Sequence, residues 1–223
     1  MPESFHYKDL GLIPYKKAWD YQSILFNTLL EEKACGETGQ NLLLFCEHRH
    51  VFTIGKSGNL NNLLLNEQQL KEKDIEYYHI DRGGDITYHG PGQLVAYPIF
   101  NLDSFGIGTR EYVYRLEELI INAMKRFNIT CSRLEGAAGI WIDADIPAKS
   151  RKICAIGVRS SRRVTMHGLA LNVNTDLSYF NYINPCGFTD RGVTSMQKEL
   201  GKEVDFNEVK KVVLEEFKKV FAS

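Results

Sequence analysis

Three stretches of the chain repeat apolar residues every three or four positions, which is the spacing of an amphipathic helix. The first runs from Tyr15 to Ala34 and meets Gly36 as a stop signal. The second follows Thr109, which we expect to be its N-cap, and the third is opened by Asn207. The apolar positions are Ala18, Tyr21, Leu25 and Leu29 in the first stretch, Val113, Leu116, Ile120, Ala123, Met124 and Phe127 in the second, and Val209, Val213, Phe217 and Val220 in the third.

Shorter runs rich in aliphatic, β-branched and aromatic residues predict strands between these helices. They cover 41–46, 51–55, 75–80, 93–100, 139–143, 152–158 and 169–174. The runs come in adjacent groups rather than in strict alternation with helices, and short helices are expected near Asn66 and Thr194. This order favours an α/β fold of the α+β type, a mixed and largely antiparallel sheet with packed helices, over a doubly wound parallel sheet. No shift in composition marks a boundary, so we predict one domain over residues 1–223.

Composition narrows the class of protein. The 223 residues are 43% hydrophobic, which is ample for a packed core. With 27 lysines and arginines against 28 aspartates and glutamates, the net charge is −1, so we expect no nucleic-acid partner. No cationic N-terminal segment leads into an apolar run, and no stretch approaches the roughly 18 apolar residues of a membrane span. We therefore expect a cytoplasmic protein without membrane association, or an organellar form that has lost a transit peptide, and we take a monomer as the default.

The cysteines and histidines give no sign of a disulfide framework or a metal site. The five cysteines are Cys35, Cys46, Cys131, Cys154 and Cys186, an odd number without a C-x-x-C pair. The nearest approach to a metal motif is His48 with His50, and no further Cys or His cluster lies beside them. The sequence thus predicts a reducing compartment and no metal.

The stretch "RGGDITYHGPGQLVAYP", from Arg82 to Pro98, is rich in glycine. Glycine permits close approach of the backbone to a ligand and leaves N–H groups exposed. Two tight turns of a hairpin would explain one or two glycines, but four of them and Pro91 favour a loop that contacts a ligand. Neither the dinucleotide-binding fingerprint nor the P-loop pattern occurs.

A second candidate is Lys152, which opens the apolar run 152–158. Regular strand alternation would place Lys152, Cys154 and Ile156 on one face of the sheet. Such a lysine is either a solvated residue of an edge strand or a cation directed into a site. Downstream, His167 and Gly168 repeat the His-Gly step of residues 89–90, and a neutral histidine bonded within the fold is an alternative for both.

The third candidate is Cys186 in "YINPCGF", between Pro185 and Gly187. Proline stiffens the chain and glycine leaves room around it, so this loop suits a reactive thiol. A buried cysteine with a purely structural role is the alternative.

Taken together, these stretches resemble the lipoyl(octanoyl) transferase family, the octanoyl-[acyl-carrier-protein]:protein N-octanoyltransferases. The matching motifs are R-G-G-x-x-T-Y-H-G-P-G-Q at 82–93, R-K-I-C-A-I-G at 151–157, H-G-L-A-L-N-V-N-x-D-L at 167–177 and I-N-P-C-G at 183–187. The likeness extends through "EHRHVFTIG" at 47–55 and "GAAGIWI" at 136–142.

The resemblance implies a fold related to the catalytic domains of biotin and lipoate protein ligases. It implies that Cys186 is the acyl-thioester nucleophile and that Lys152 is its ion or acid–base partner. The substrate-binding positions that it implies are Arg82, Gly83, Gly84, Asp85, Ile86, Thr87, Tyr88, His89, Ala155, Ile156, Gly157, Gly168, Leu169 and Ala170, with His167 in support. The side chains of Tyr88, Ile156, Leu169 and Ala170 are our candidates for an apolar slot. The oxyanion donor stays open among Gly157, Gly168 and Gly187.

The implied reaction transfers an octanoyl or lipoyl group from the phosphopantetheine of acyl carrier protein to a lysine of a lipoyl domain. Acceptors would be the lipoyl domains of 2-oxoacid dehydrogenases and the glycine cleavage H protein, with no ATP or metal. Three rivals remain: an ATP-dependent lipoate or biotin ligase, an amidotransferase between lipoyl-carrying proteins, and a silent acyl-binding protein.

Overall fold

The structure is a computed structural model that describes residues 4–184 and 191–221. Its centre is an eight-stranded sheet. The strands, in order across the sheet, are β1 (His6–Ile13), β2 (Leu42–His48), β6 (Gln93–Ile99), β10 (Val164–Asn172), β9 (Arg151–Ser161), β8 (Ala137–Ile142) and β7 (Ser132–Leu134), and β11 (Gly192–Val193) pairs with β9. Only the β1–β2 and β9–β11 pairings of this described sheet are parallel. The predicted mixed, largely antiparallel sheet is confirmed.

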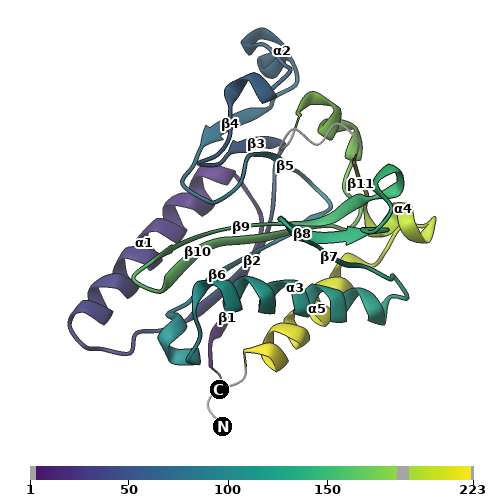
Figure 1. Cartoon of the computed structure of the whole chain (residues 1–223). Coiled ribbons are helices and arrows are strands. Elements are labelled where there is room, and N and C mark those ends of the chain that lie inside the picture. The colour runs from purple at the N-terminus through teal and green to yellow at the C-terminus, as the bar shows by residue number, and fades with distance from the viewer. Residues whose placement is uncertain (1–3, 185–190, 222–223) are drawn as a thin grey trace.

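Helices cover both faces of this sheet (Figure 1). Helix α1 (Tyr15–Ala34) packs over β6 and β10, while α3 (Thr109–Arg126) and α5 (Phe206–Val220) pack together on the opposite face. The larger apolar core lies beneath α3 and α5 and takes its side chains from both helices and the central strands. The face under α1 is the one that leaves room for a pocket.

A second, three-stranded sheet stands beside the α1 face. It consists of β4 (Glu76–His79), β3 (Val51–Ile54) and β5 (Ile86–His89), and α2 (Glu67–Glu72) follows β3 in the chain. The remaining short elements are α4 (Met196–Leu200) and the 3₁₀ turns η1 (Leu60–Asn62), η2 (Leu102–Phe105), η3 (Pro147–Lys149) and η4 (Leu177–Tyr182). Because β5 runs into the large sheet through β6, the glycine-rich stretch bridges the two sheets.

The helical pattern in the sequence located the long helices, although the starts of two differ. Helix α1 has the predicted bounds. The N-cap of α3 is Gly108, because Thr109 is already helical and its hydroxyl donates to Ser160. Helix α5 starts at Phe206, since the Asp205 carboxylate accepts from the N–H groups of Asn207 and Glu208 at 2.9 and 3.2 Å. Both expected short helices are present, and Asn66 caps α2 in a capping box.

Strands β1, β5, β7 and β11 were not predicted; β1 and β7 lie at the two edges of the large sheet, and β5 lies at an edge of the small one. Strand β1 shows no regular alternation of buried and exposed residues, and its register with β2 shifts between Asp9 and Leu12, which interrupts the period of two that a strand pattern would show.

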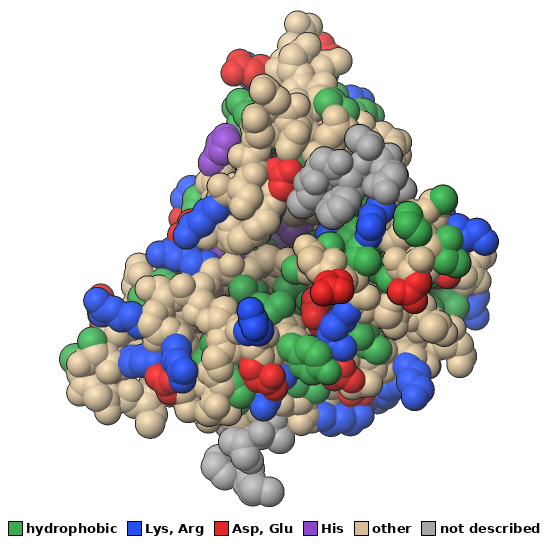
Figure 2. Space-filling view, in the orientation of Figure 1, with side chains coloured by type: hydrophobic (Ala, Val, Ile, Leu, Met, Phe, Trp, Pro, Cys, Tyr) green, Lys and Arg blue, Asp and Glu red, His purple; other side chains and the backbone are tan. Residues whose placement is uncertain are grey.

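The two ends of the described chain meet. The hydroxyl of Ser4 donates to the carbonyl of Phe221, at the end of the molecule away from the small sheet (Figure 1). Acidic and basic side chains are intermixed over the face seen in Figure 2, as the net charge of −1 leads one to expect. Among the described residues, every helix is too short or too polar to cross a bilayer.

Candidate active site

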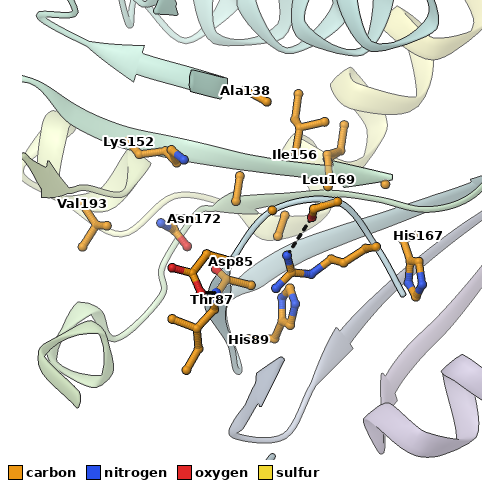
Figure 3. Close-up of a pocket in the computed structure, with 18 of the residues that line it drawn as sticks. Asp85, Thr87, His89, Ala138, Lys152, Ile156, His167, Leu169, Asn172 and Val193 are labelled. Carbon is orange, nitrogen blue, oxygen red and sulfur yellow. Dashed lines mark hydrogen bonds between the residues drawn. The ribbon is translucent and has the colours of Figure 1, made fainter. Parts of the chain in front are cut away.

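A cavity of about 460 Å³ lies between the α1 face of the large sheet and the stretch from Arg82 to His89 (Figure 3). Its volume falls within the usual range of roughly 300–1,000 Å³ for small-molecule sites. Strands β6, β9 and β10 form the floor, and Trp141 of β8 and Val193 of β11 border one end. The glycine-rich stretch and the strands that carry Lys152 and Gly168 therefore line a single cavity, together with Arg191, Gly192 and Val193, which follow the Cys186 stretch in the chain.

The cavity floor is built from small side chains in register across three strands. Ala155 of β9 pairs with Ala170 of β10, which pairs with Val95 of β6. The next row along β9 and β10 pairs Gly157 with Gly168. Successive side chains on the same face of a strand lie about 6.7 Å apart. The result is an apolar trough that follows β9.

The loop at Arg82 and Gly83 closes one end of the trough. The Gly83 N–H donates to the Val158 carbonyl at 2.9 Å, which docks the loop on β9. A methyl group on Gly157 would lie 2.9 Å from the Gly83 carbonyl oxygen and 3.1 Å from Cδ of Arg82. A methyl group on Gly55 would lie 2.3 Å from the Gly84 carbonyl oxygen. The loop therefore requires glycine at its contacts with β9 and with the end of β3.

The charged side chains of this loop make internal contacts. The Arg82 guanidinium donates to the backbone and side-chain oxygens of Thr53 at 2.7 and 3.0 Å. The Asp85 carboxylate accepts from the Ile86 N–H at 2.7 Å and from the Asn62 amide at 2.8 Å. Both side chains are buried, and these bonds fix the shape of the loop. Its residues from Arg82 to Thr87 all line the cavity.

A chain of buried hydrogen bonds runs beneath the cavity from the loop to the opposite end. His89 bonds to Gln93 at 2.7 Å, and the Gln93 amide donates to Asn172 at 2.9 Å. Asn172 in turn donates to the Thr194 carbonyl at 3.0 Å, and the Thr194 N–H donates to the Lys152 carbonyl at 3.0 Å. The chain ties the two ends of the cavity to each other.

Lys152 lines the cavity at the end remote from the loop (Figure 3). Its ammonium nitrogen lies 4.6 Å from the centroid of the Trp141 ring, a cation–π contact. Gly139 adopts φ of +113°, and a methyl group there would lie 2.5 Å from the Cys154 carbonyl oxygen and 3.5 Å from Cδ and Cε of Lys152. The Cys154 backbone and the positive φ therefore require glycine at 139, next to the stem of Lys152.

The predicted alternation around Lys152 is wrong. Lys152 pairs with Trp141 and Cys154 with Ile140, so Ile153 is an extra residue, a β-bulge. Ile153 and Cys154 consequently both enter the core under α3 and α5. The bulge places Lys152 on the cavity face together with Ala155 and Gly157. Burial raises the pKa of the Cys154 thiol, which makes it a poor nucleophile.

Cys186, the predicted nucleophile, lies outside the described residues. The described residues on either side of its segment are anchored. The Asn184 N–H donates to the Asn62 carbonyl at 2.8 Å, and β11 pairs Gly192 with Arg151 and Val193 with Lys152. Arg191, Gly192 and Val193 also line the cavity.

The remaining predicted residues divide between the cavity and the cores. Gly84, Ile86, Thr87, Gly168 and Ala170 line the cavity as expected. Tyr88 is fully buried in the core of the small sheet, where its hydroxyl bonds to His50 at 2.8 Å. Although Ile156 and Leu169 border the cavity, their side chains lie on the α3 side of the sheet, away from Thr87 and His89 (Figure 3).

Two of the predicted histidines are held by the fold. Burial lowers the pKa of His89 to about 3, so its ring is neutral. His167 adopts φ of +59° and donates from Nε2 to the Asp81 carboxylate at 3.1 Å. Burial lowers the pKa of His167, and the bond to Asp81 opposes that shift. Both rings line the cavity end near Arg82.

Three further residues, Trp141, Asn172 and Tyr97, line the cavity but were not predicted to do so. Trp141 and Asn172 stand inside the motifs that carried the resemblance, and Tyr97 is the last residue but one of the glycine-rich stretch. The Tyr97 hydroxyl donates to Nε2 of His48 at 2.7 Å, while Nδ1 of His48 donates to the Ile13 carbonyl at 2.9 Å. Within the described residues no group of His, Cys, Asp and Glu could hold a metal ion.

The buried side chain of His48 should make the folded protein less stable in acid. Burial lowers its pKa to about 4, below the 6.5 of an exposed histidine. Between pH 6.5 and 4, His48 is protonated in the unfolded chain but stays neutral in the folded chain. The free energy of unfolding therefore falls by on the order of 3 kcal/mol as the pH drops from 6.5 toward 4. Urea unfolding across this pH range should show a shallower pH dependence for His48→Gln. The exposed His79→Gln is the control, and an unchanged slope in His48→Gln would contradict the assignment.

Comparison with known proteins assigns the chain to a family. Residues 14–218 match the model described as "Lipoyl protein ligase A/B catalytic domain". The octanoyltransferase of Parabacteroides distasonis is 54% identical over 220 residues, covering 99% of this chain and 100% of the relative. The octanoyltransferase of Bacteroides fragilis is 58% identical over 202 residues, 91% of each chain.

Solved structures share the fold. A lipoate-protein ligase A bound with ATP has a TM-score of 0.71 at 16% identity, covering 97% of this chain and 85% of that one. The biotin protein ligase of Aquifex aeolicus in complex with biotin and ATP has a TM-score of 0.53 at 15% identity, covering 97% and 70%. The predicted relation to both kinds of ligase is confirmed at the level of the fold. The chain therefore belongs to the family of the lipoyl protein ligase A/B catalytic domain and, within it, to the octanoyltransferases.

Proposed function

We propose that this protein transfers an octanoyl or lipoyl group from acyl carrier protein to a lysine of a lipoyl domain, through a thioester on Cys186. The observation that carries the proposal is the shape of the cavity, an apolar trough with a lysine at one end and a closed loop at the other. Carbon–carbon bonds of ~1.5 Å make an extended octanoyl chain about 9 Å long. Such a chain fits along β9 between Lys152 and Gly157, which lie about 13 Å apart along the strand because the bulge at Ile153 removes one of the five regular steps.

Two acyl transfers would use this site in turn. In the first, the Cys186 sulfur adds to the thioester carbonyl carbon, the carbon–sulfur bond to pantetheine breaks, and Lys152 gives a proton to the departing thiolate. In the second, the lysine amine of the lipoyl domain attacks the Cys186 thioester, Lys152 accepts a proton from that amine, and the Cys186 thiolate leaves. Atoms and charge balance in both steps.

The described residues around the Cys186 segment support this pairing. Strand β11 begins six residues after Cys186 (192 − 186) and pairs directly with Arg151 and Lys152. Six residues span at most about 20 Å, so the chain length allows the thiol to reach Lys152.

We propose that the reaction needs neither ATP nor a metal, because a thioester donor is already activated. Exchange between two thioesters is nearly isoenergetic, and the final amide is more stable than either. The partners would be octanoyl-acyl carrier protein as donor and, as acceptors, the glycine cleavage H protein and the lipoyl domains of 2-oxoacid dehydrogenases. We place the reaction in the cytoplasm and the enzyme as a monomer.

Intact-protein mass spectrometry tests the proposal. The protein is incubated with octanoyl-acyl carrier protein without ATP, and an octanoyl adduct that hydroxylamine removes is expected on the wild type. Cys186→Ala should carry no adduct. Cys35→Ala, which changes an exposed free cysteine, is the matched control and should keep it. A folded wild type without an adduct, which acylates lipoyl domains from free octanoate only when ATP is added, would instead be a ligase.

A further inference from the structure

We propose that Asn172 is a catalytic residue whose side-chain amide donates a hydrogen bond to the carbonyl oxygen of the acyl group as that oxygen gains negative charge. The inference deepens the proposed function and rests on it, because both transfers pass through a tetrahedral intermediate. In each step the π electrons of the carbonyl move to oxygen when the nucleophile adds, and they return when the leaving group departs. Asn172 neither gains nor loses a proton.

Asn172 stands at the reactive end of the cavity. It is the last residue of β10, is only 4% exposed and lines the same cavity as Lys152. Both residues bond to Thr194, Lys152 through its carbonyl and Asn172 through its amide nitrogen, each at 3.0 Å. In Figure 3 Asn172 is drawn between Lys152 and the stretch at Asp85 and Thr87.

The orientation of the Asn172 amide is fixed by its partners. Oδ1 accepts from Gln93 at 2.9 Å, and one N–H of Nδ2 donates to the Thr194 carbonyl. Gln93 cannot be flipped, because its nitrogen also donates to the Tyr88 carbonyl at 3.1 Å while its oxygen accepts from His89 at 2.7 Å. The oxygen of Asn172 must therefore face Gln93.

One donor of this amide remains for a ligand. Of the two N–H groups on Nδ2, only one has an acceptor within the part of the chain that the structure describes. A planar amide held on both sides keeps the second N–H in a fixed direction, and a donor fixed before the reaction costs no reorganisation during it.

Of the three glycines left open by the sequence, Gly187 lies outside the described residues, and Gly157 and Gly168 are less suitable donors. Gly168 lies four residues from Asn172 along β10, which corresponds to about 13 Å. Gly157 pairs with Gly168 at the loop end of the trough, where the acyl tail would end. A carbonyl next to Lys152 is therefore much closer to Asn172 than to either glycine.

Asn172→Asp tests the inference by removing both N–H groups while keeping size and the acceptor for Gln93. We expect turnover with octanoyl-acyl carrier protein to fall about 10²–10³-fold, as when one oxyanion donor is lost, with KM changed only slightly. Asn174→Asp is the matched control, because Asn174 bonds to both backbone groups of Val204. An equal loss of turnover in this control would overturn the inference.

Measurements of ligand affinity distinguish a catalytic role of Asn172 from a role in folding. Heptyl trifluoromethyl ketone forms a tetrahedral adduct with a cysteine, whereas octanoate binds without one. Asn172→Asp and Asn172→Leu should lose affinity for the ketone by a factor similar to the loss in turnover and should keep affinity for octanoate. Unchanged ketone affinity, or an equal loss for both ligands, would overturn the role of Asn172. A wild type that binds octanoate but never captures the ketone would overturn the thioester mechanism itself, and this inference with it.

Discussion

Lys152→Arg should lower turnover about 10²–10⁴-fold, the usual contribution of a general acid–base group. Arginine keeps the positive charge, but its pKa above 12 prevents it from exchanging protons during turnover. The prediction thus separates two roles that a cation beside a thiol can have, attraction of the thiolate and transfer of protons.

Electrostatic attraction of the thiolate by the Lys152 ammonium would by itself raise the rate only slightly. A free cysteine with a pKa of ~8.5 is only about 3% thiolate at pH 7. Lowering that pKa by ~2 units would raise the thiolate fraction ~25-fold, but the intrinsic nucleophilicity would fall roughly 6- to 10-fold. The net gain is about three- or fourfold. In the proposed mechanism, we therefore expect most of the effect of Lys152 to come from protonating the pantetheine thiolate and deprotonating the incoming amine.

The measurement is steady-state transfer of octanoyl to a lipoyl domain over a range of pH. Lys149→Arg, three positions away on an exposed turn, is the control for loss of lysine as such. If Lys152→Arg kept near-normal turnover, Lys152 would act through its charge, and proton transfer would belong to another group.

Gly157→Ala should lower kcat/KM about 10²-fold, because a displacement of about 1 Å can cost that much. The added methyl group would meet the Gly83 carbonyl oxygen at 2.9 Å, so one of the two backbones must move, which strains the hydrogen bond from Gly83 to Val158. The loop at Arg82 would lift from β9 and the closed end of the trough would open.

Transfer assays with donors of increasing acyl length would reveal this change. Gly157→Ala should lose activity with octanoyl and lose discrimination against longer chains. Gly108→Ala, where an added methyl group has no neighbour within 4 Å, is the control. Wild-type kinetics in Gly157→Ala would show that the loop does not bound the acyl site.

The sequence located the long helices because each repeats apolar residues at helical spacing, most clearly in α3 and α5, whereas the buried side of α1 includes Gln22. It failed at Lys152 because strand alternation assumes a regular pleat, and one extra residue at Ile153 reverses the face of every position that follows. A bulge has no reliable signature in an apolar run such as "KICAIGV".

Asn172 and Trp141 were missed for a different reason. Each is unremarkable on its own strand and becomes part of the site only through pairing between β6, β8, β9 and β10. The glycine-rich loop, in contrast, was recognisable from the sequence, because a backbone that packs closely against another backbone or a ligand leaves no room for a side chain. The role of Cys186 stays a prediction.

The meeting of Ser4 and Phe221 has a practical consequence for engineering. Since the ends lie together, a short linker could join them and the chain could be reopened elsewhere, for example at the exposed turn between β9 and β10. A carrier protein or lipoyl domain fused to either end would leave the molecule from the side away from the small sheet (Figure 1). Its tether would have to pass around the large sheet to present an acyl arm, so linker length would control the effective concentration of a fused substrate.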